Sequence, residues 1–482
     1  MGLPKFDCAV ILECAVEELS WGQMSRDIIR PLGAFALFHE LQKLQVPATL
    51  INYAVYWDAD QLIETLTSWM ERHGYRCPLI LHSSLFGSDA LDCYAGISRV
   101  IKHFKNVHGS TLIAGGPVVL ADQISDPELL PHAVFQGRSL HLFADWIRSG
   151  GDLLPTAVSV KGVDIFQSEN GAIIEQPVVP VLYDDFCLNE NDIIGFETRV
   201  GCKFNCTFCA LASRNAKEVH DSTEDQLFTF FDTANRRYGI TRFSCMDDTF
   251  NEDQVKIDRL LNTVKRLAYR PTIVGYNRFD LIVNDNSQLE QLDQCGFVGH
   301  YFGIETFHRE ASKVIRKGLR KDRAYDTLRL IRDQFPHWHT STGMIIGVPK
   351  EPAEHIMQTV DELCEQRLVK GIIPMALNIQ HVPGTDMSNF SKTPEKYGIT
   401  ITARHELHSE WKHDQMDSST AELLEKRVAA KAAKKGIGAL DPWEWIAKSI
   451  PVTANEHRSQ YIKRKQEYLL GRIPTGVYYS SP

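Results

Sequence analysis

The sequence lacks any run of about 18 apolar residues, so we expect no membrane-spanning helix. Its beginning lacks the basic stretch and the small-residue cleavage site of a signal peptide. Phe6 also stands where a myristoylation signal has Ser or Thr. We therefore expect a cytoplasmic protein whose 11 cysteines stay reduced.

Positive charge is also in deficit. The 482 residues carry a formal net charge of −9, which gives no overall attraction for a polyanion such as a nucleic acid. The last segment differs, because residues 421–482 contain 11 Lys and Arg against 6 Asp and Glu. This basic segment leaves a nucleic acid or a modified nucleotide open as a partner; the alternative is a solvated helix surface.

The length predicts more than one domain, because a single hydrophobic core stops growing at about 250–300 residues. Residues 1–150 alternate strand-like and helix-like segments, which predicts a Rossmann-like, doubly wound parallel sheet. Ligands of such sheets bind beyond the carboxyl ends of the strands. Small residues that let a ligand approach the backbone are expected there: Ser83, Ser84, Gly87, Ser88, Gly115 and Gly116.

Three further regions follow in this predicted α/β protein. Residues 151–190 are expected to form a linker with a hairpin at Asn170-Gly171. Residues 191–395 contain six strand–helix repeats, which predict a (β/α)6 partial TIM barrel with its active site beyond the carboxyl ends of the strands. Residues 396–482 show mostly helical spacing.

Three cysteines lie just beyond the first strand of the predicted barrel: Cys202, Cys206 and Cys209. A structural zinc site needs four closed ligands, and the nearest other candidates, Cys187 and His220, lie well outside the group. A [4Fe–4S] cluster held by three thiolates leaves one iron open for a substrate or cofactor. The count of three therefore favours a catalytic cluster, with zinc as the alternative.

The spacing Cys-x3-Cys-x2-Cys, with aromatic Phe208 before the third cysteine, resembles the radical S-adenosylmethionine (SAM) superfamily. The resemblance covers residues 191–395 and includes FSCMDDTFNED, YNRFDLI, FGIETFHREASKVIRKG, GMIIGVPKEP and HVPGTDM. It implies that SAM chelates the open iron. An electron from a reduced partner such as flavodoxin or ferredoxin would cleave SAM to methionine and a 5′-deoxyadenosyl radical, which abstracts hydrogen from an unactivated carbon.

The same resemblance implies SAM-binding residues. One of Asp247 and Asp248 is expected to accept the SAM ammonium, while the other caps the next helix. Arg278 and Arg316 are candidate partners for the SAM carboxylate. Glu305 is expected to accept ribose hydroxyls, with a salt bridge to Arg278 as the alternative. The expected adenine contacts are Phe208, Ile345 and Val348.

A doubly wound domain before such a barrel resembles the cobalamin-binding subfamily. RPLGAFALFHELQKLQVPATLIN is similar to that domain's first helix and second strand, and LHSSLFGS and IAGGP stand where its ligand loops lie. The Asp-x-His-x-x-Gly signature is absent, with Arg30 in place of its His, so cobalamin would bind without that ligand. The resemblance implies cobalamin-dependent methylation of an unactivated carbon.

Two alternatives remain open at this point. The first is a cobalamin-independent radical SAM enzyme that isomerises or modifies its substrate, which could be a nucleotide or a nucleic acid. The second, less favoured, is a zinc-stabilised binding protein without enzymatic activity.

Overall fold

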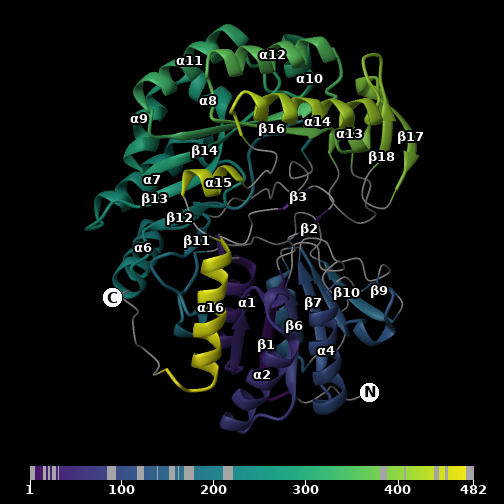
Figure 1. Cartoon of the computed structure of the whole chain (residues 1–482), viewed down its shortest axis with the longest axis vertical. Helices are drawn as coiled ribbons and strands as arrows, with labels where there is room; N and C mark the ends of the chain where they lie inside the picture. Colours follow the sequence, from purple (N-terminus) through teal and green to yellow (C-terminus); the bar gives the residue numbers. More distant parts are fainter. Residues whose placement is uncertain are drawn as a thin grey trace. The chain divides into compact units, whose positions relative to one another are not determined.

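The computed structural model describes residues 6–14, 18–19, 22–23, 29–30, 32–83, 94–116, 124–137, 139–150, 158–160, 162–167, 179–209, 221–379, 388–405, 409–438, 444–450 and 454–473. The chain divides into two compact units (Figure 1). Unit 1 comprises residues 1–195, 229–241 and 452–482, and unit 2 comprises residues 196–228 and 242–451.

Unit 1 is built on a seven-stranded sheet of order β5-β1-β6-β7-β8-β10-β9. Its strands are parallel apart from β9, which runs antiparallel to β10. The spatial order of the first five strands, 2-1-3-4-5 along the chain, is that of a flavodoxin-like doubly wound sheet. The strand bounds are β1 Cys8–Glu13, β5 Ala48–Ile51, β6 Pro78–Ser83, β7 Thr111–Gly116, β8 Ala133–Gln136, β9 Val158–Val160 and β10 Val163–Gln167.

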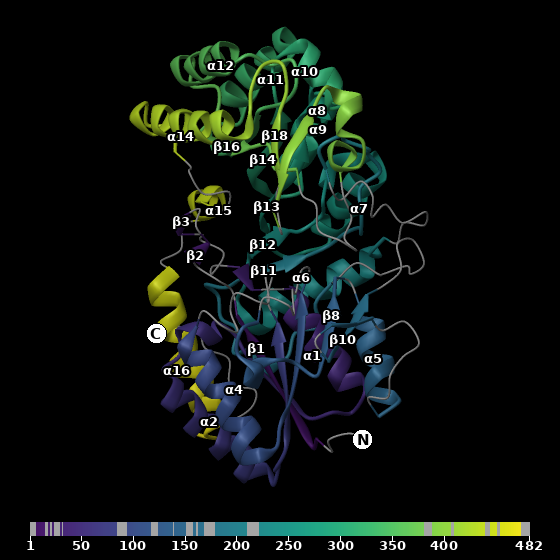
Figure 2. The same cartoon turned by 90° about the vertical axis from the view of Figure 1, so that its right-hand side faces the viewer.

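Helices of unit 1 bury their apolar sides against this sheet. α2 contacts α4 and α16, and these three helices share one apolar core with the strands (Figures 1 and 2). α2 begins where the Asp58 carboxylate accepts from Gln61 N at 2.9 Å, and it ends at Gly74, whose φ of 77° suits glycine. The helix bounds are α1 Leu32–Lys43, α2 Ala59–His73, α4 Ala95–His108, α5 Leu140–Arg148 and α16 Ala454–Leu469.

Strands β11 to β16 of the predicted six-stranded partial barrel are neighbours in chain order, and β12 to β16 belong to unit 2. Residues Ile193 and Ile194 of β11 belong to unit 1, where they pair with the short strand β4 (Ile29–Arg30). The strand bounds are β11 Ile193–Phe196, β12 Arg242–Cys245, β13 Thr272–Arg278, β14 Phe297–Glu305, β15 His339–Ile346 and β16 Gly371–Ala376. The helices between them are α6 Glu224–Tyr238, α7 Gln254–Lys265, α8 Phe279–Asn284, α9 Ser287–Gln294, α10 Arg309–Val314, α11 Lys321–Gln334 and α12 Ala353–Glu365. The predicted α/β class, with a doubly wound sheet and a partial barrel, is confirmed.

The later part of the chain is less helical than its spacing predicts. A hairpin of β17 (Thr400–Arg404) and β18 (Ser409–Lys412) precedes α14 (Ser418–Lys434) and α15 (Glu444–Ser449). Side chains of β18 alternate between buried and exposed, and buried Trp411 donates its Nε1–H to Leu377 O at 2.8 Å. This alternation has the period of a strand, which the prediction overlooked. The region is also divided, since residues 396–451 belong to unit 2 and residues 452–482 to unit 1.

Short elements complete the chain. Asn170-Gly171, where a hairpin was expected, lies outside the described residues, and the hairpin that is described joins β9 to β10. No helix in the described ranges is both long and apolar enough to cross a membrane. The remaining elements are β2 Glu18–Leu19, β3 Gly22–Gln23, α13 Asn389–Lys392 and the 3-10 helices η2 Ala54–Tyr56, η4 Pro127–Leu129, η5 Asp184–Phe186, η7 Phe250–Glu252 and η8 Pro394–Tyr397.

A buried ion pair joins separate segments of unit 1. Arg30 Nε donates to Asp192 Oδ1 at 2.6 Å, and both side chains are fully buried. His457 Nε2 of α16 lies 3.0 Å from the same Asp192 oxygen. The Arg30 guanidinium also stacks on Tyr53 and Tyr461, at 5.0 and 4.3 Å from the ring centroids. The charge of Arg30 is thus stabilised only as long as these partners surround it.

We expect Asp192→Ala to lower the free energy of unfolding by about 3–5 kcal/mol, because Arg30 would be left as an uncompensated buried charge. Urea denaturation measures this change. As a control, Asp60→Ala removes an exposed pair with Arg99 and should cost less than about 1 kcal/mol. Similar losses in the two variants would contradict the prediction.

The same pair makes unit 1 sensitive to acid. Burial alone would raise the pKa of Asp192, but Arg30 and His457 hold it well below its usual range. A carboxyl with a depressed pKa contributes stability above its unfolded pKa of about 3.9 and loses it as the pH falls further. The wild type should therefore lose stability more steeply than Asp192→Ala below about pH 4.

Candidate active site

The cysteine loop, residues 197–209, follows β11 in unit 2. Gly201, with a φ of 83°, turns the backbone before Cys202, and Cys209 N donates to Cys206 O at 3.2 Å. None of the three cysteines forms a disulfide with another described residue, and Cys206 is buried while the other two are partly exposed. Among the residues whose placement is described, no three His, Cys, Asp or Glu side chains are gathered closely enough to hold a metal ion.

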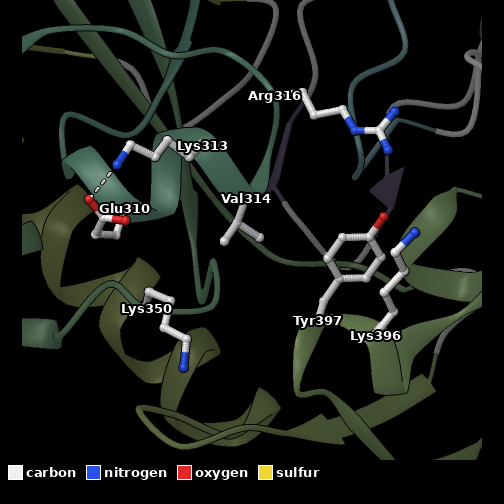
Figure 3. Close-up of a pocket in the computed structure, with 7 residues that line it drawn as sticks. All are labelled: Glu310, Lys313, Val314, Arg316, Lys350, Lys396 and Tyr397. Atoms are coloured by element: carbon white, nitrogen blue, oxygen red, sulfur yellow. Dashed lines mark hydrogen bonds and ion pairs between the residues drawn. The ribbon is translucent and has the colours of Figure 1, made fainter.

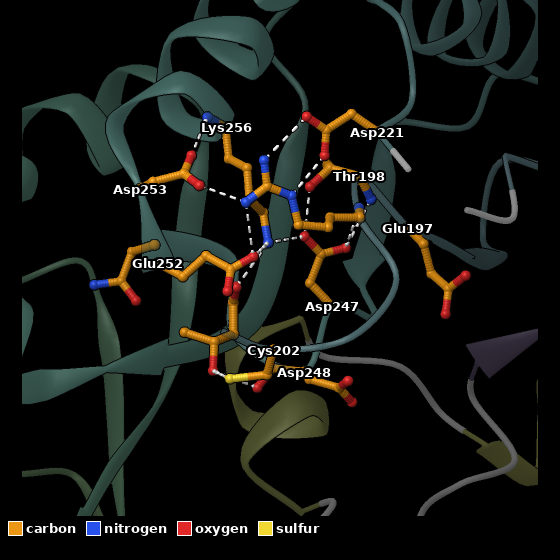
Figure 4. Close-up of polar contacts among 12 residues, drawn as sticks. Glu197, Thr198, Cys202, Asp221, Asp247, Asp248, Glu252, Asp253 and Lys256 are labelled. Atoms are coloured by element: carbon orange, nitrogen blue, oxygen red, sulfur yellow. Dashed lines mark hydrogen bonds and ion pairs between the residues drawn. The ribbon is translucent and has the colours of Figure 1, made fainter. Parts of the chain in front are cut away.

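Arg199 anchors the start of this loop through the carboxylates of Asp221, Glu252 and Asp253, which are labelled in Figure 4. Its Nε and Nη2 donate to the two oxygens of Asp221 at 2.5 and 3.0 Å. Its Nη1 donates to Glu252 at 3.1 Å and also to Asp253. The hydrogen bonds that Arg199 donates to Asp221 and Asp253 raise its pKa despite its partial burial. Glu252 in turn accepts from Lys203 N at 3.0 Å, so the network fixes the backbone on both sides of Cys202.

Asp247 is held inside the same network. It accepts from Thr198 N at 2.7 Å, from the Thr198 hydroxyl and from Arg199 N at 3.3 Å. The Nζ atom of fully buried Lys256 lies 2.7 Å from Oδ2 of Asp247 and 3.2 Å from Oε1 of Glu252. The Asp247 carboxylate, 1% exposed, therefore positions the cysteine loop.

Neither Asp247 nor Asp248 caps the next helix, which was one of the two roles predicted for this pair. The expected helix cap is made instead by Asp253, whose carboxylate accepts from Lys256 N at 3.1 Å at the start of α7. Asp248 is exposed at the end of β12, and Thr249 next to it lies within 3.5 Å of the Cys202 sulfur. Asp248 is thus the acidic residue of the pair that remains accessible to a ligand.

Arg278, at the end of β13, supports the middle of the cysteine loop. Its Nη1 donates to Cys206 Sγ at 3.3 Å, and its guanidinium carbon lies 3.8 Å from the centroid of the Phe204 ring. Its Nε donates to both oxygens of Asp280 at 2.8 and 3.0 Å, and its Nη2 donates to Arg316 O at 3.2 Å. Burial raises the pKa of Cys206, and the positive charges of Lys317 and Arg278 oppose that effect.

The alternative salt bridge between Glu305 and Arg278 is wrong. Glu305 pairs with Lys317 at 3.4 Å, and Lys317 also donates to Gly303 O at 2.8 Å. Glu305 adopts a left-handed φ of 68° at an irregularity where β14 pairs with β15. Such a backbone is costly for a residue other than glycine and is commonly kept at functional positions. Burial raises the pKa of Glu305, and Lys317 partly offsets this.

The other predicted residues are distributed over both units. Phe208 is half-buried in the cysteine loop, and Ile345 and Val348 are buried at and just after the end of β15. In unit 1, Ser83 and Gly115 are Cα partners at the ends of β6 and β7, and Gly116 follows. Ser84, Gly87, Ser88 and His220 lie outside the described residues.

Three basic side chains that organise the cysteine loop were missed: Arg199, Lys256 and Lys317. Basic residues near strand ends are common and usually solvated, so their sequence signal is weak. Cys187, considered as a zinc ligand, belongs to unit 1, and burial raises its pKa to about 11.

Comparison with known families now adds to this geometry. Residues 196–363 match the Radical SAM superfamily. This part of the chain is a radical SAM domain. Its match begins at the last residue of β11 and therefore includes all three cysteines. A three-thiolate donor set with one cationic hydrogen-bond donor at sulfur fits the [4Fe–4S] cluster of this superfamily.

Solved structures resemble the chain well beyond the radical SAM domain. OxsB, a cobalamin-dependent SAM radical enzyme solved with aqua-cobalamin, is 14% identical with a TM-score of 0.61, covering 96% of this chain and 72% of its own. TsrM, a radical SAM methyltransferase from Kitasatospora setae solved with cobalamin and a [4Fe–4S] cluster, is 13% identical with a TM-score of 0.58. That match covers 96% of this chain and 99% of TsrM. The likeness shows a shared fold.

Two curated relatives match part of this chain. Both are tRNA-2-methylthio-N(6)-dimethylallyladenosine synthases, from Streptomyces avermitilis and Mycobacterium marinum. The first is 20% identical over 49% of this chain and 47% of its own length. The second is 23% identical over 39% of each. The chain thus spans less than half the length of the curated relatives it matches.

Proposed function

We propose that the chain is a radical SAM enzyme whose cluster is held by Cys202, Cys206 and Cys209. The observation that carries the proposal is three cysteines on one loop of a radical SAM domain, fixed by ion pairs of Arg199 on one side and by Arg278 on the other. A [4Fe–4S] cluster bound there would supply the electron that cleaves SAM reductively.

The residues around the cysteine loop divide into positioning and binding groups. Arg199, Asp247 and Lys256 orient the loop, and their contacts leave them no free polar atom for SAM within the described network. Arg278 is similarly committed to Cys206 and Asp280. The proposed SAM contacts are therefore Asp248 for the ammonium, Arg316 for the carboxylate, Glu305 for ribose, and Phe208, Ile345 and Val348 for adenine.

Unit 1 is proposed to bind cobalamin for methylation of an unactivated carbon. The support is its 2-1-3-4-5 sheet, whose switch point lies between β1 and β6, next to Ser83, Gly115 and Gly116. OxsB and TsrM, which share the fold over 96% of this chain, are described as cobalamin-bound. Arg30 is buried in its ion pair with Asp192. We therefore expect the cobalt to bind without a protein ligand from that segment.

A cobalamin-independent modification of a nucleotide or nucleic acid is the second candidate, because both curated relatives are named for tRNA modification. Either enzyme needs a one-electron donor. The proposed compartment is the cytoplasm, where the thiols stay reduced.

Anaerobic reconstitution tests the proposed function directly. The chain is expected to hold about four irons and to release 5′-deoxyadenosine from SAM when dithionite is added. One bound zinc and no cleavage would remove both enzyme hypotheses. Incubation with hydroxocobalamin and gel filtration should leave a stoichiometric corrinoid spectrum, and its loss would favour the second candidate.

Gly115→Trp is expected to abolish corrinoid retention while leaving iron content and SAM cleavage unchanged. A Cβ atom added at Gly115 would not clash with its surroundings, because the nearest atom is Phe135 O at 3.4 Å. Its indole would then fill the space beyond β7 that the corrinoid needs. Val107→Trp, at a site 63% exposed on α4, is the matched control and should retain corrinoid. Equal retention by both variants would place the corrinoid elsewhere.

A further inference from the structure

A pocket in unit 2 lies beside the cysteine loop and has a basic lining (Figure 3). Its volume is about 480 Å³. One wall comes from α10 and the turn after it, another from η8, and a third from the turn after β15. The lining residues are Glu310, Lys313, Val314, Arg316, Lys350, Lys396 and Tyr397.

Two walls of this basic pocket are hydrogen-bonded to the segment between the cysteines. Thr207, between Cys206 and Cys209, donates its hydroxyl to Val314 O at 2.7 Å. On the other side, Thr207 O accepts from Phe390 N at 3.2 Å, in the helix just before η8. Asn389 Nδ2 also donates to Asn205 Oδ1 at 3.1 Å. The pocket is therefore built directly against the metal-ligating segment.

The pocket is positively charged in a chain whose net charge is −9. Four of its seven lining side chains are cationic and one is a carboxylate. Lys313 pairs with Glu310 at 2.8 Å and Lys350 with Asp414 at 2.9 Å, both on the exposed surface where such pairs are weak. In the part of the chain with described placement, no ion pair involves the side chains of Arg316 or Lys396.

The backbone also presents two of these cations in an unusual way. Arg316 and Lys350 adopt left-handed φ values of 61° and 77°. Residues other than glycine keep such conformations only where the surroundings enforce them, and these sites are often functional. The backbone of Arg316 is held by a hydrogen bond from the Arg278 guanidinium to the Arg316 carbonyl. The same guanidinium also donates to the sulfur of Cys206, so it links the pocket to that cysteine.

We propose that this basic pocket is the docking surface for an acidic one-electron carrier protein, of which flavodoxin is the chemical type. The inference rests on the proposed function, because a cluster that cleaves SAM must be reduced from outside. Electron-transfer complexes use small interfaces and rely on charge complementarity for rapid encounter. One electron leaves the reduced carrier and is accepted at the cluster; no bond forms or breaks and no other reactant is needed.

A nucleic acid is the less suitable occupant. Binding to a phosphate backbone requires cations spread along an extended track, since each contact neutralises one phosphate. Here the cations converge on one pocket. Electron delivery to the cluster explains why the basic pocket lies next to the cysteine segment. Binding of a phosphate backbone would not require that position.

The double variant Lys350→Glu with Lys396→Glu tests the proposal in the reconstituted chain. Arg316 is left unchanged because it is also a proposed SAM contact. The first readout is the Kd of oxidised flavodoxin, measured by flavin fluorescence anisotropy at low and high salt. We expect Kd to rise by at least about tenfold at low salt, with a weaker salt dependence. The control is Lys426→Glu, at an exposed position of α14. This helix contributes no residue to the pocket, so the control should leave Kd unchanged.

The second readout is SAM cleavage with two reductants. Cleavage driven by reduced flavodoxin should fall by about tenfold in the double variant, while cleavage driven by dithionite, which needs no docking surface, should match the wild type. An unchanged Kd, or an equal change in Lys426→Glu, would overturn the proposal. Equal losses with both reductants would assign the pocket to SAM or substrate and also overturn it.

Two further outcomes separate this inference from its foundation. If the double variant loses affinity for a tRNA but not for flavodoxin, the pocket binds RNA and the docking proposal fails. If the wild type cleaves no SAM even with dithionite, the proposed function fails, and the flavodoxin Kd alone then decides whether the surface docks an acidic protein.

Discussion

Cys206→Ala is expected to lower bound iron from about four per chain to near zero and to reduce SAM cleavage to the background rate. The proposed cluster would have three protein ligands, so loss of one would leave two irons without any protein thiolate. Cys206 is also the sulfur that Arg278 contacts, at 3.3 Å. Iron and sulfide assays, with the absorbance of the anaerobically reconstituted protein, measure the effect.

Two other cysteines provide controls for this result. Cys295 is fully buried at the end of α9, outside the cysteine loop, so Cys295→Ala should retain full iron content. Cys187→Ala examines the zinc alternative, because it removes the other thiol considered as a ligand. Retention of iron by Cys206→Ala, or release of a metal by Cys187→Ala, would show that the three-cysteine assignment is wrong.

Lys256→Met is expected to lower the free energy of unfolding by about 3–5 kcal/mol, because Asp247 and Glu252 would lose a fully buried cation. Both carboxylates also hold the backbone of the cysteine loop, so reconstituted iron should fall as well. Denaturant unfolding of the metal-free chain separates the first effect from the second.

Lys265→Met, at an exposed position on the same helix, is the control for this variant and should change stability by less than about 0.5 kcal/mol. If the two variants lose stability equally, the buried ion pairs of Lys256 do not carry the effect.

The elements of both units could be predicted because their signals are local. Buried strands such as β1 and β11 are continuous apolar runs, and α2 carries its own cap at Asp58 and its own stop at Gly74. The three cysteines were found in the same way, since their spacing lies within one loop. Alternation of strands and helices then sufficed for both parallel sheets.

The contacts that organise the candidate site could not be predicted, because they join residues far apart in the sequence. Arg199 meets Asp221 and Glu252, and Arg278 meets Cys206, across separations of 22, 53 and 72 residues. Nothing local distinguishes these arginines from solvated ones. The predicted partner of Arg278 was wrong for this reason: Lys317, in the turn after α10, pairs with Glu305 instead.

The composition of unit 1 has a consequence for how the chain is made. Its sheet is complete by residue 167, but α16 supplies Tyr461 and Lys465, which meet Asn52 and Asp185. During synthesis these partners appear only after the whole of unit 2 has been translated, which takes tens of seconds at about 5–20 residues per second. Until then Asp185 and Asp192 lack the cationic side chains of α16. The unit that leaves the ribosome first is therefore the last to be completed.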